Sequence, residues 1–152
     1  MAAGGLTRVR ETIVIDYRLE VRAATIAERN AAGACLTEHT GAAGGPALKF
    51  EPFSVLAFCE GAVVGGVIGQ VFWNWLYTEL VWVEKAFRGC GIGKAVMQRA
   101  EERARELCLT GIYLWTQSWQ AAGFYSKLGF ENFVVFDNFP PGHQRLGFRK
   151  YL

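Results

Sequence analysis

Apolar and polar residues follow short periodic patterns along the whole chain. The stretch TIVIDYRL, residues 12–19, alternates like a half-buried strand. An alanine-rich stretch from Val21 to about Thr40 predicts a helix, which the breaker GAAGGP ends. Residues 53–73 predict two strands joined by a Glu-Gly turn, and LYTELVWVE, residues 76–84, predicts another strand after a turn near Asn74. The first half of the chain is therefore expected to form strands around one early helix.

A long helical pattern opens the second half. It follows the loop RGCGIGK, residues 88–94, directly. The side of this predicted helix away from its apolar face carries Glu101 and Arg105, which we expect to form a solvent-exposed ion pair that stabilises the helix only slightly. The apolar face of this helix consists of Ile92, Val96, Ala100, Ala104 and Leu107.

The remaining residues predict three strands and one short helix. GIYLWTQS indicates a strand, WQAAGFYSKLG a short helix that ends at Gly129, and FENFVVFD and HQRLGFRKYL two closing strands. The chain contains no internal repeat and no linker long enough to divide it. The pattern predicts one α+β domain over residues 1–152.

Composition excludes several classes of protein. Apolar residues make up 51% of the 152 residues and charged residues 20%, as in a packed globular chain. The net charge of +2 includes no basic run, which argues against a nucleic-acid partner. No apolar stretch is long enough to span a membrane, and the first residues lack the apolar core of a signal peptide. These features predict a cytoplasmic protein with neither a nucleic-acid nor a membrane partner.

The cysteines indicate neither disulfides nor a metal site. They stand far apart, without a CxxC motif or a neighbouring pair of histidines. Such spacing is typical of reduced thiols in the cytosol, so no metal is expected. Most of them are expected to be small buried hydrophobes. The four are Cys35, Cys59, Cys90 and Cys108.

The loop RGCGIGK has the composition of an anion site. A helix N-terminus exposes unpaired N–H groups and the positive end of the helix dipole, and glycines let a phosphate approach the backbone closely. The Walker A spacing is absent, and no third glycine completes the dinucleotide pattern GxGxxG. What remains is R-x-x-G-x-G, from Arg88 through Gly91 and Gly93. The other interpretation is a simple tight turn; the position between a strand and a helix favours the phosphate site.

Two segments resemble the GCN5-related N-acetyltransferase (GNAT) family. LVWVEKAFRGCGIGKAVMQRAEERA is similar to its strand–RxxGxG/A–helix segment, and QAAGFYSKLGF to its A-x-x-F/L-Y-x-K-x-G-F segment. VVGGVIG, WNWLYTELVWV, SWQAAGFYSKLGF and FPPGHQRLGFRK together resemble a small bacterial-type subgroup. The resemblance implies a mixed, mostly antiparallel sheet flanked by helices, with splayed fourth and fifth strands. It also implies acetyl-CoA as co-substrate.

The same resemblance implies which residues bind acetyl-CoA. The loop amides would bind the pyrophosphate, and the splayed strand would receive the pantetheine arm and the acetyl group. Ser118 stands where many members carry an Asn that contacts that arm. The implied set is Val81, Trp82 and Val83 by their backbone, Arg88, Gly89, Cys90, Gly91, Ile92, Gly93 and Lys94 in the loop, and Ser118.

Acetyl transfer to an amine also needs an acid and a base. By resemblance Tyr125 lies beside the coenzyme sulfur and protonates the leaving thiolate; otherwise it is a core tyrosine. Glu79, the only acid in LYTELVWV, is the candidate base if it is half-buried. The alternative is that Glu79 lies on the solvent face of its strand. His143 is the rival candidate for the base. Cys90 is not expected to be a nucleophile, because the family transfers acetyl directly in a ternary complex.

The acceptor is the least defined part of the prediction. Trp73, Trp75 and Tyr77 alternate onto one side of a turn and strand. They either wall a pocket for an organic cation or form an edge that a second subunit closes in a homodimer. The expected function is an acetyl-CoA-dependent N-acetyltransferase that acts on a primary amine of a small molecule. The alternative is a non-catalytic module that binds acyl-CoA as a sensor or interaction partner.

Overall fold

The computed structural model describes residues 18–152, so the strand expected at residues 12–19 lies almost entirely outside the described residues. By its internal contacts the chain divides into two compact units, Met1–His39 and Thr40–Leu152. The prediction of a single domain stays a prediction. Among the described residues, no helix has the length and apolar character needed to cross a membrane.

Helix α1, Ile26–Ala42, begins five residues later than Val21, where the sequence placed it. Its start is fixed by a capping box. The Glu28 N–H donates to Thr25 Oγ1 at 3.2 Å, and the Thr25 N–H donates to Glu28 Oε2 at 2.7 Å. These reciprocal bonds satisfy N–H groups that a helix otherwise leaves unpaired at its first turn. The helix ends within GAAGGP, as expected.

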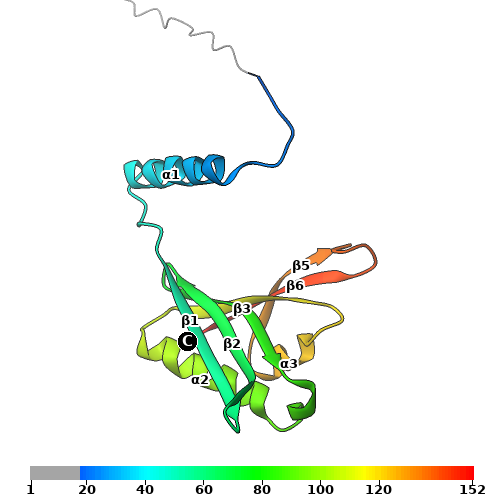
Figure 1. Cartoon of the computed structure of the whole chain (residues 1–152). Coiled ribbons are helices and arrows are strands. Elements are labelled where there is room, and N and C mark those ends of the chain that lie inside the picture. Colours follow the sequence, from blue (N-terminus) through cyan, green and yellow to red (C-terminus); the bar gives the residue numbers. More distant parts are fainter. Residues whose placement is uncertain (1–17) are drawn as a thin grey trace, which may run out of the picture. The chain divides into compact units, whose positions relative to one another are not determined.

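The second unit is built on a mixed sheet with the strand order β1-β2-β3-β4-β6-β5 (Figure 1). All neighbouring strands are antiparallel except β3 and β4, which are parallel. The predicted mixed, mostly antiparallel sheet flanked by helices is confirmed. In chain order, β1 to β6 span Phe50–Cys59, Ala62–Phe72, Trp75–Val83, Gly111–Gln117, Glu131–Asp137 and Gln144–Tyr151.

Both predicted hairpin turns occur, and each contains two residues of positive φ. Glu60 and Gly61 have φ of 49° and 82°, and Trp73 and Asn74 have φ of 45° and 76°. Two successive left-handed residues give the turn whose twist matches that of the flanking antiparallel strands. Three consecutive strands, β1, β2 and β3, are therefore joined by short connections.

Helix α2, Ile92–Glu106, packs across β1 to β4 and covers one face of the sheet (Figure 1). A second, short helix, α3 at Ala122–Lys127, follows β4. A 3-10 turn at Lys85–Phe87 lies between β3 and the glycine loop. The core between sheet and helices includes Val67, Leu76, Val96, Met97, Ala100, Ala104, Ile112, Leu114, Phe130 and Phe148.

The predicted ion pair between Glu101 and Arg105 forms, but its carboxylate is not solvent-exposed as expected, and the placement of Leu107 on the apolar face is wrong. Glu101 is 7% exposed, and its Oε1 lies 2.7 Å from Lys150 Nζ, with Arg105 at 3.5 Å from the other oxygen. Lys150 also donates to the Leu128 carbonyl. The buried carboxylate of Glu101 is therefore paired with the half-buried ammonium of Lys150, which β6 supplies. Leu107, placed on the apolar face, lies beyond the last helical residue and is exposed.

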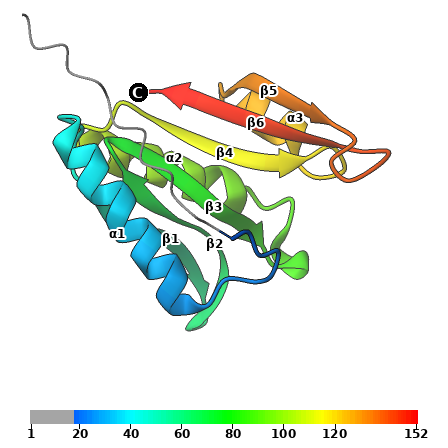
Figure 2. The same cartoon turned by 90° about the horizontal axis from the view of Figure 1, so that it is seen from above.

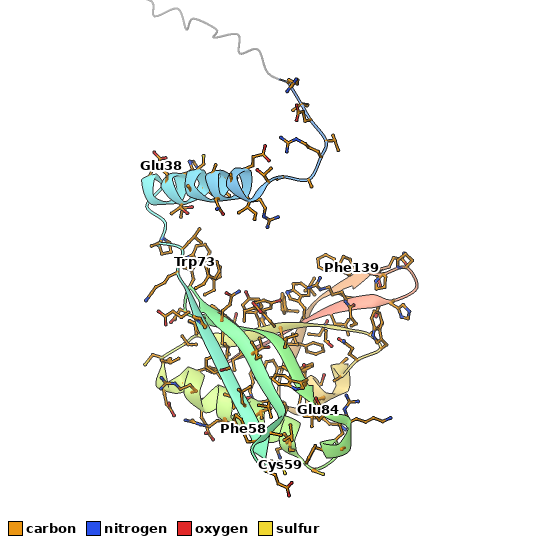
Figure 3. The ribbon with its side chains drawn as sticks, in the orientation of Figure 1. Glu38, Phe58, Cys59, Trp73, Glu84 and Phe139 are labelled. Atoms are coloured by element: carbon orange, nitrogen blue, oxygen red, sulfur yellow. The ribbon has the colours of Figure 1, made fainter. Side chains whose placement is uncertain are left out.

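The expectation of buried cysteines is also wrong. All four are free and exposed. Cys59 ends β1 beside the hairpin turn (Figure 3), Cys90 lies in the glycine loop, and Cys108 has a φ of 55° just after α2. Ends and turns of elements face solvent, which explains why these thiols are not in the core.

Strands β3 and β4 pair only at their beginnings. Trp75 to Thr78 pair with Gly111 to Leu114, and no pairing continues from Glu79 to Val83. Figure 2 shows the two strands diverging towards their carboxyl ends. The predicted splay between neighbouring strands is confirmed; among the described strands these are the third and fourth.

Candidate active site

A cavity of about 600 Å³ occupies the gap between the diverging ends of β3 and β4. Residues from both strands, from the start of α3 and from the glycine loop line it. They are Thr78, Glu79, Leu80, Val81, Trp82, Val83, Leu114, Trp115, Thr116, Gln120, Ala121, Phe124, Tyr125 and Arg88. The sequence-predicted Tyr125, Glu79, Val81, Trp82, Val83 and Arg88 therefore meet in one place.

A β-bulge at Glu79 begins the free part of β3. Gly69 of β2 pairs with Thr78 and Ile68 pairs with Leu80, so Glu79 has no partner opposite it. A Cβ on Gly69 would overlap the Tyr77 carbonyl oxygen, so only glycine permits this close approach. The bulge bends β3 where it leaves β4, which helps to open the cavity.

Glu79 is exposed rather than half-buried. Its Oε1 accepts a hydrogen bond from Gln70 Nε2 at 3.0 Å. Of the two positions that the sequence left open for Glu79, the structure shows the solvent-exposed one, at a bulge where no residue of β2 pairs with it. Glu79 nevertheless lines the cavity, where an exposed carboxylate can exchange a proton with water.

The edge of β3 that faces the cavity has no strand partner from Glu79 to Val83, although the other edge pairs with β2. Unpaired backbone N–H and C=O groups of a strand edge can bind an extended ligand. At the end of this edge the Val83 carbonyl accepts a hydrogen bond from Arg88 Nε at 2.9 Å. This bond fixes the entry to the glycine loop against β3.

The glycine loop leads into α2 through two left-handed residues. Gly89 and Gly91 have φ of 79° and 84°, and Gly91 is the N-cap of α2. The first helical bond runs from the Ala95 N–H to the Gly91 carbonyl at 3.0 Å, and no side chain caps the helix. The preceding amides are free for an anion.

The beginning of α2 lies close to the other walls of the cavity. A Cβ on Gly93 would lie 3.4 Å from Phe124 Cζ and 3.6 Å from Val83 Cγ2. Lys94 and Cys90 are exposed and do not line the cavity, and the Cys90 Sγ–H donates weakly to the Arg88 carbonyl at 3.8 Å. Cys90 thus lies at the loop surface.

Tyr125 is buried within an aromatic cluster and still reaches the cavity. It is 6% exposed and contacts the rings of Phe124, Phe130 and Phe148. Its hydroxyl has no hydrogen-bond partner among residues 18–152. Burial raises its pKa to about 12, because a dehydrated tyrosinate is penalised. The phenol therefore keeps its proton at neutral pH.

Three polar residues of the cavity are not among the site residues that the sequence predicts. Thr78, at the closed end where β3 and β4 part, is 2% exposed, and its Oγ1 has no partner among the described residues. Thr116 Oγ1 donates to Gln120 Oε1 at 3.0 Å, and the Gln117 N–H donates to the same oxygen. No motif marks them, because only the divergence of the strands brings them together.

Two predicted residues lie elsewhere. Ser118 Oγ accepts a hydrogen bond from the Gln144 N–H at 3.2 Å, and His143 packs edge-on against Trp119 with ring centroids 4.5 Å apart. Both line a separate hollow beside the β5–β6 loop. Gln120, two residues after Ser118, lines the main cavity instead. The geometry favours a structural role for His143 and Ser118.

The predicted aromatic group divides into two parts. Trp75 and Tyr77 share a face of the sheet and contact Tyr113, at 6.3 Å and 4.9 Å between ring centroids. Trp73 lies in the turn (Figure 3), stacks on Phe72 and donates its indole N–H to the Ala47 carbonyl. None of the three lines the cavity.

Comparison with known families decides the classification. The sequence model of the Acetyltransferase (GNAT) family matches residues 21–130. The chain belongs to this family. It is therefore an N-acetyltransferase, and GNAT acetyltransferases use acetyl-CoA. The match covers α1, β1 to β4, the glycine loop, α2 and α3.

Curated relatives include two bacterial acetyltransferases. The chain is 38% identical over 103 residues to the blasticidin-S acetyltransferase of Streptomyces morookaense, a match that covers 64% of this chain and 75% of the relative. It is 37% identical over 71 residues to an acetyltransferase of Agrobacterium fabrum, covering 47% of this chain and 52% of that one. The chain thus spans about half the length of the second relative.

Solved GNAT structures share the fold. A Bacillus cereus acetyltransferase superposes with a TM-score of 0.78 at 26% identity, covering 88% of this chain and 98% of that one. A Bacillus anthracis protein described as a streptothricin acetyltransferase was solved with acetyl coenzyme A; its TM-score is 0.60 at 25% identity. The latter match covers 68% of this chain and 64% of that one.

Proposed function

We propose that this GNAT acetyltransferase transfers the acetyl group of acetyl-CoA to a primary amine of a small molecule, by direct attack in a ternary complex. The observation that supports the proposal most is the unpaired edge of β3 beside a cavity that also holds Tyr125. Bound acetyl-CoA supplies a thioester, an acyl group that an amine can attack. The residues present fit such a ligand at both of its ends.

The glycine loop would hold the pyrophosphate. The amides from Gly89 to Lys94 precede the first helical hydrogen bond of α2, and the helix dipole favours an anion there. The space beside Gly91 is open, with no atom within 4 Å of the position that a Cβ would take. A phosphate can therefore approach this backbone without displacing a side chain.

The free edge of β3 would hold and polarise the thioester. Backbone N–H groups among Val81, Trp82 and Val83 that face the cavity can donate to the thioester oxygen as negative charge develops on it. Such preorganised donors supply a few kcal/mol of transition-state stabilisation. The side chains of these residues serve packing alone.

Tyr125 would protonate the leaving sulfur. When the amine nitrogen bonds to the carbonyl carbon, the C–S bond breaks and its electrons remain on sulfur. A phenol and a thiol differ by about 1.5 pKa units in water. The dehydration that raises the pKa of Tyr125 to about 12 also disfavours a thiolate in the same cavity, so proton transfer costs only about 2 kcal/mol.

Glu79 would accept a proton from the ammonium group of the acceptor through water, so that the neutral amine can attack the thioester. It is exposed at the cavity wall, and only its Oε1 is engaged by Gln70, so Oε2 is free to bind water. An exposed carboxylate returns the proton to solvent quickly. His143 lies in the separate hollow and is the weaker candidate.

The acceptor class rests on the relatives. One relative is named for blasticidin S and one solved structure is described by streptothricin, both antibiotics, so an amine-containing small molecule is the favoured acceptor. We also propose a cytoplasmic location, because all four thiols are free and exposed. No observation favours the non-catalytic module.

The test is turnover with a panel of primary amines, followed by mass detection of the N-acetyl product. Thiol reagents would also label the four exposed cysteines, so loss of the thioester absorbance is the better continuous assay. Direct transfer predicts intersecting double-reciprocal plots and no acetylated protein after incubation with acetyl-CoA alone. Cys90→Ala should retain full activity. Parallel plots with an acetylated Cys90 would contradict the ternary mechanism.

A further inference from the structure

Arg145, near the start of β6, holds a positive charge that no carboxylate balances within residues 18–152. Its guanidinium carbon lies 5.1 Å from the ring centroid of Trp115 and 5.3 Å from that of Phe139. Figure 3 places Phe139 at the loop between β5 and β6. Arg145 appears in no ion pair and no side-chain hydrogen bond among the described residues.

Arg149 lies on the same strand and the same face as Arg145 and has the carboxylate partner that Arg145 lacks. Its guanidinium lies over two rings in the same way, Phe133 at 5.5 Å and Tyr151 at 5.4 Å. It also bonds Glu131, with 2.6 Å between Nε and Oε1. The two arginines thus share a strand, a face and aromatic packing, but only Arg149 has a carboxylate partner.

No neighbouring strand offers Arg145 the same partner. Arg145 is paired with Phe136 on β5 and with Gln117 on β4, neither of which is charged. Asp137 follows Phe136, so its side chain projects to the opposite face of the sheet, where it accepts a bond from Gln144 Nε2 at 2.7 Å. The acid that follows Phe136 is therefore already engaged on the other face.

Arg145 does not line the cavity itself, but it lies against a residue that does. Trp115, whose ring it covers, is a lining residue on β4. Two aromatic rings restrict the guanidinium plane, which leaves its N–H edges to bind a ligand. A guanidinium held in this way is suited to the paired oxygens of a carboxylate or a phosphate.

We propose that Arg145 binds an acidic group, a carboxylate or a phosphate, of the molecule that enters the cavity, and that this molecule is the acceptor. The acceptor would then carry an anionic group as well as its reactive amine. This inference rests on the proposed function and narrows its substrate class. The other source of such an anion is a phosphate of the co-substrate, which the experiment must separate.

The experiment compares ω-amino carboxylates of increasing chain length with the corresponding carboxamides, which have the same amine and nearly the same shape. Arg145→Met keeps an apolar stem over the rings and removes the charge. Arg149→Met is the matched control on the same strand. Steady-state kinetics give kcat/KM for each amine, and calorimetry gives the affinity of each amine independently of turnover.

The expected result is a preference of the wild-type enzyme for acids over amides. Arg145→Met should lose about 10- to 100-fold in kcat/KM and in affinity for the acids, the usual effect of removing a charge-assisted hydrogen bond, and little for the amides. Arg145→Lys should recover part of the loss. Arg149→Met should leave the ratio of acid to amide unchanged.

Two results would overturn the inference. One is an unchanged ratio of acid to amide in Arg145→Met, by both kinetics and calorimetry. The other is a raised KM for acetyl-CoA with an unchanged ratio, which would assign the anion to the co-substrate. Either result defeats this inference alone, whereas no acetylation of any amine by the wild type defeats the proposed function.

Discussion

Replacing Tyr125 by Phe distinguishes a catalytic phenol from a core tyrosine. The ring would keep its contacts with Phe124, Phe130 and Phe148, and the lost hydroxyl has no partner among the described residues. The free energy of unfolding should therefore change by less than about 1 kcal/mol. The affinity for acetyl-CoA should also stay within about 2-fold, because ground-state binding does not depend on proton donation.

The turnover number should fall. Loss of a general acid usually costs about 10²–10⁴-fold, and the cavity is open enough for water to replace the phenol in part, so we expect about 100-fold. That corresponds to about 2.7 kcal/mol in the activation free energy. A donor thioester with a more acidic thiol should lose less, because its leaving group needs the proton less.

The assay is loss of thioester absorbance at saturating amine, with two donors of different thiol acidity and a calorimetric binding constant for each variant. Equal turnover of wild type and Tyr125→Phe with both donors would assign Tyr125 to the core. A uniform loss with both donors would indicate a role in positioning rather than in protonation.

Tyr125 also sets a pH expectation. Its pKa is about 12 in the folded protein and about 10 in an unfolded chain, so folding strengthens the binding of this proton. The stabilising effect is complete below pH 10 and is lost as the pH rises from 10 through 12. Tyr125 should therefore cause no fall in turnover below pH 10, because it keeps its proton over this range. A fall below pH 10 that occurs in the wild type and disappears in Tyr125→Phe would contradict a raised pKa.

Four further substitutions test the remaining parts of the site and fold. Gly91→Val should abolish acetyl-CoA binding, because the new side chain enters the open space beside the backbone where the phosphate would lie. The protein should still fold, because a side chain at a φ of 84° costs only about 2 kcal/mol of strain. Calorimetry with unchanged affinity would contradict the phosphate site. Thr78→Val should raise the melting temperature by about 2–4 °C, because it removes an unpaired buried hydroxyl, whereas Thr116→Val should lower it by losing the bond to Gln120. Lys150→Met should cost about 3 kcal/mol, or roughly 8 °C, by leaving Glu101 buried with only Arg105 nearby; a calorimetric scan with no change would show that the pair is not buried in solution.

Local sequence patterns correctly predicted several turns, the glycine loop and the apolar face of α2. The hairpin turns at Glu60-Gly61 and Trp73-Asn74, the glycine loop and the end of α3 before Gly129 follow from residues close in sequence. Periodicity of α2 identified Val96, Ala100 and Ala104 as core. These features depend on backbone preferences and on which face of one element is apolar, and both are properties of a short stretch.

Long-range contacts explain the errors. Glu101 looks like a surface residue until β6 brings Lys150 to it, and the exposure of Glu79 depends on a bulge opposite Gly69 on another strand. Gln120 replaces Ser118 at the cavity because of how the chain turns after β4. Arg145 lies in the segment FPPGHQRLGFRK, but nothing in that segment marks it as a site residue; its interest comes from its aromatic neighbours and its missing carboxylate.

A crystal structure of the complex with acetyl-CoA tests the central claim most directly. We predict that the thioester lies between β3 and β4, with its oxygen within hydrogen-bond distance of a backbone N–H of Val81, Trp82 or Val83. The sulfur should lie within reach of the Tyr125 hydroxyl, and the pyrophosphate on the amides from Gly89 to Lys94. A cofactor bound outside this cavity, or a sulfur atom on the far side of the sheet from Tyr125, would contradict it.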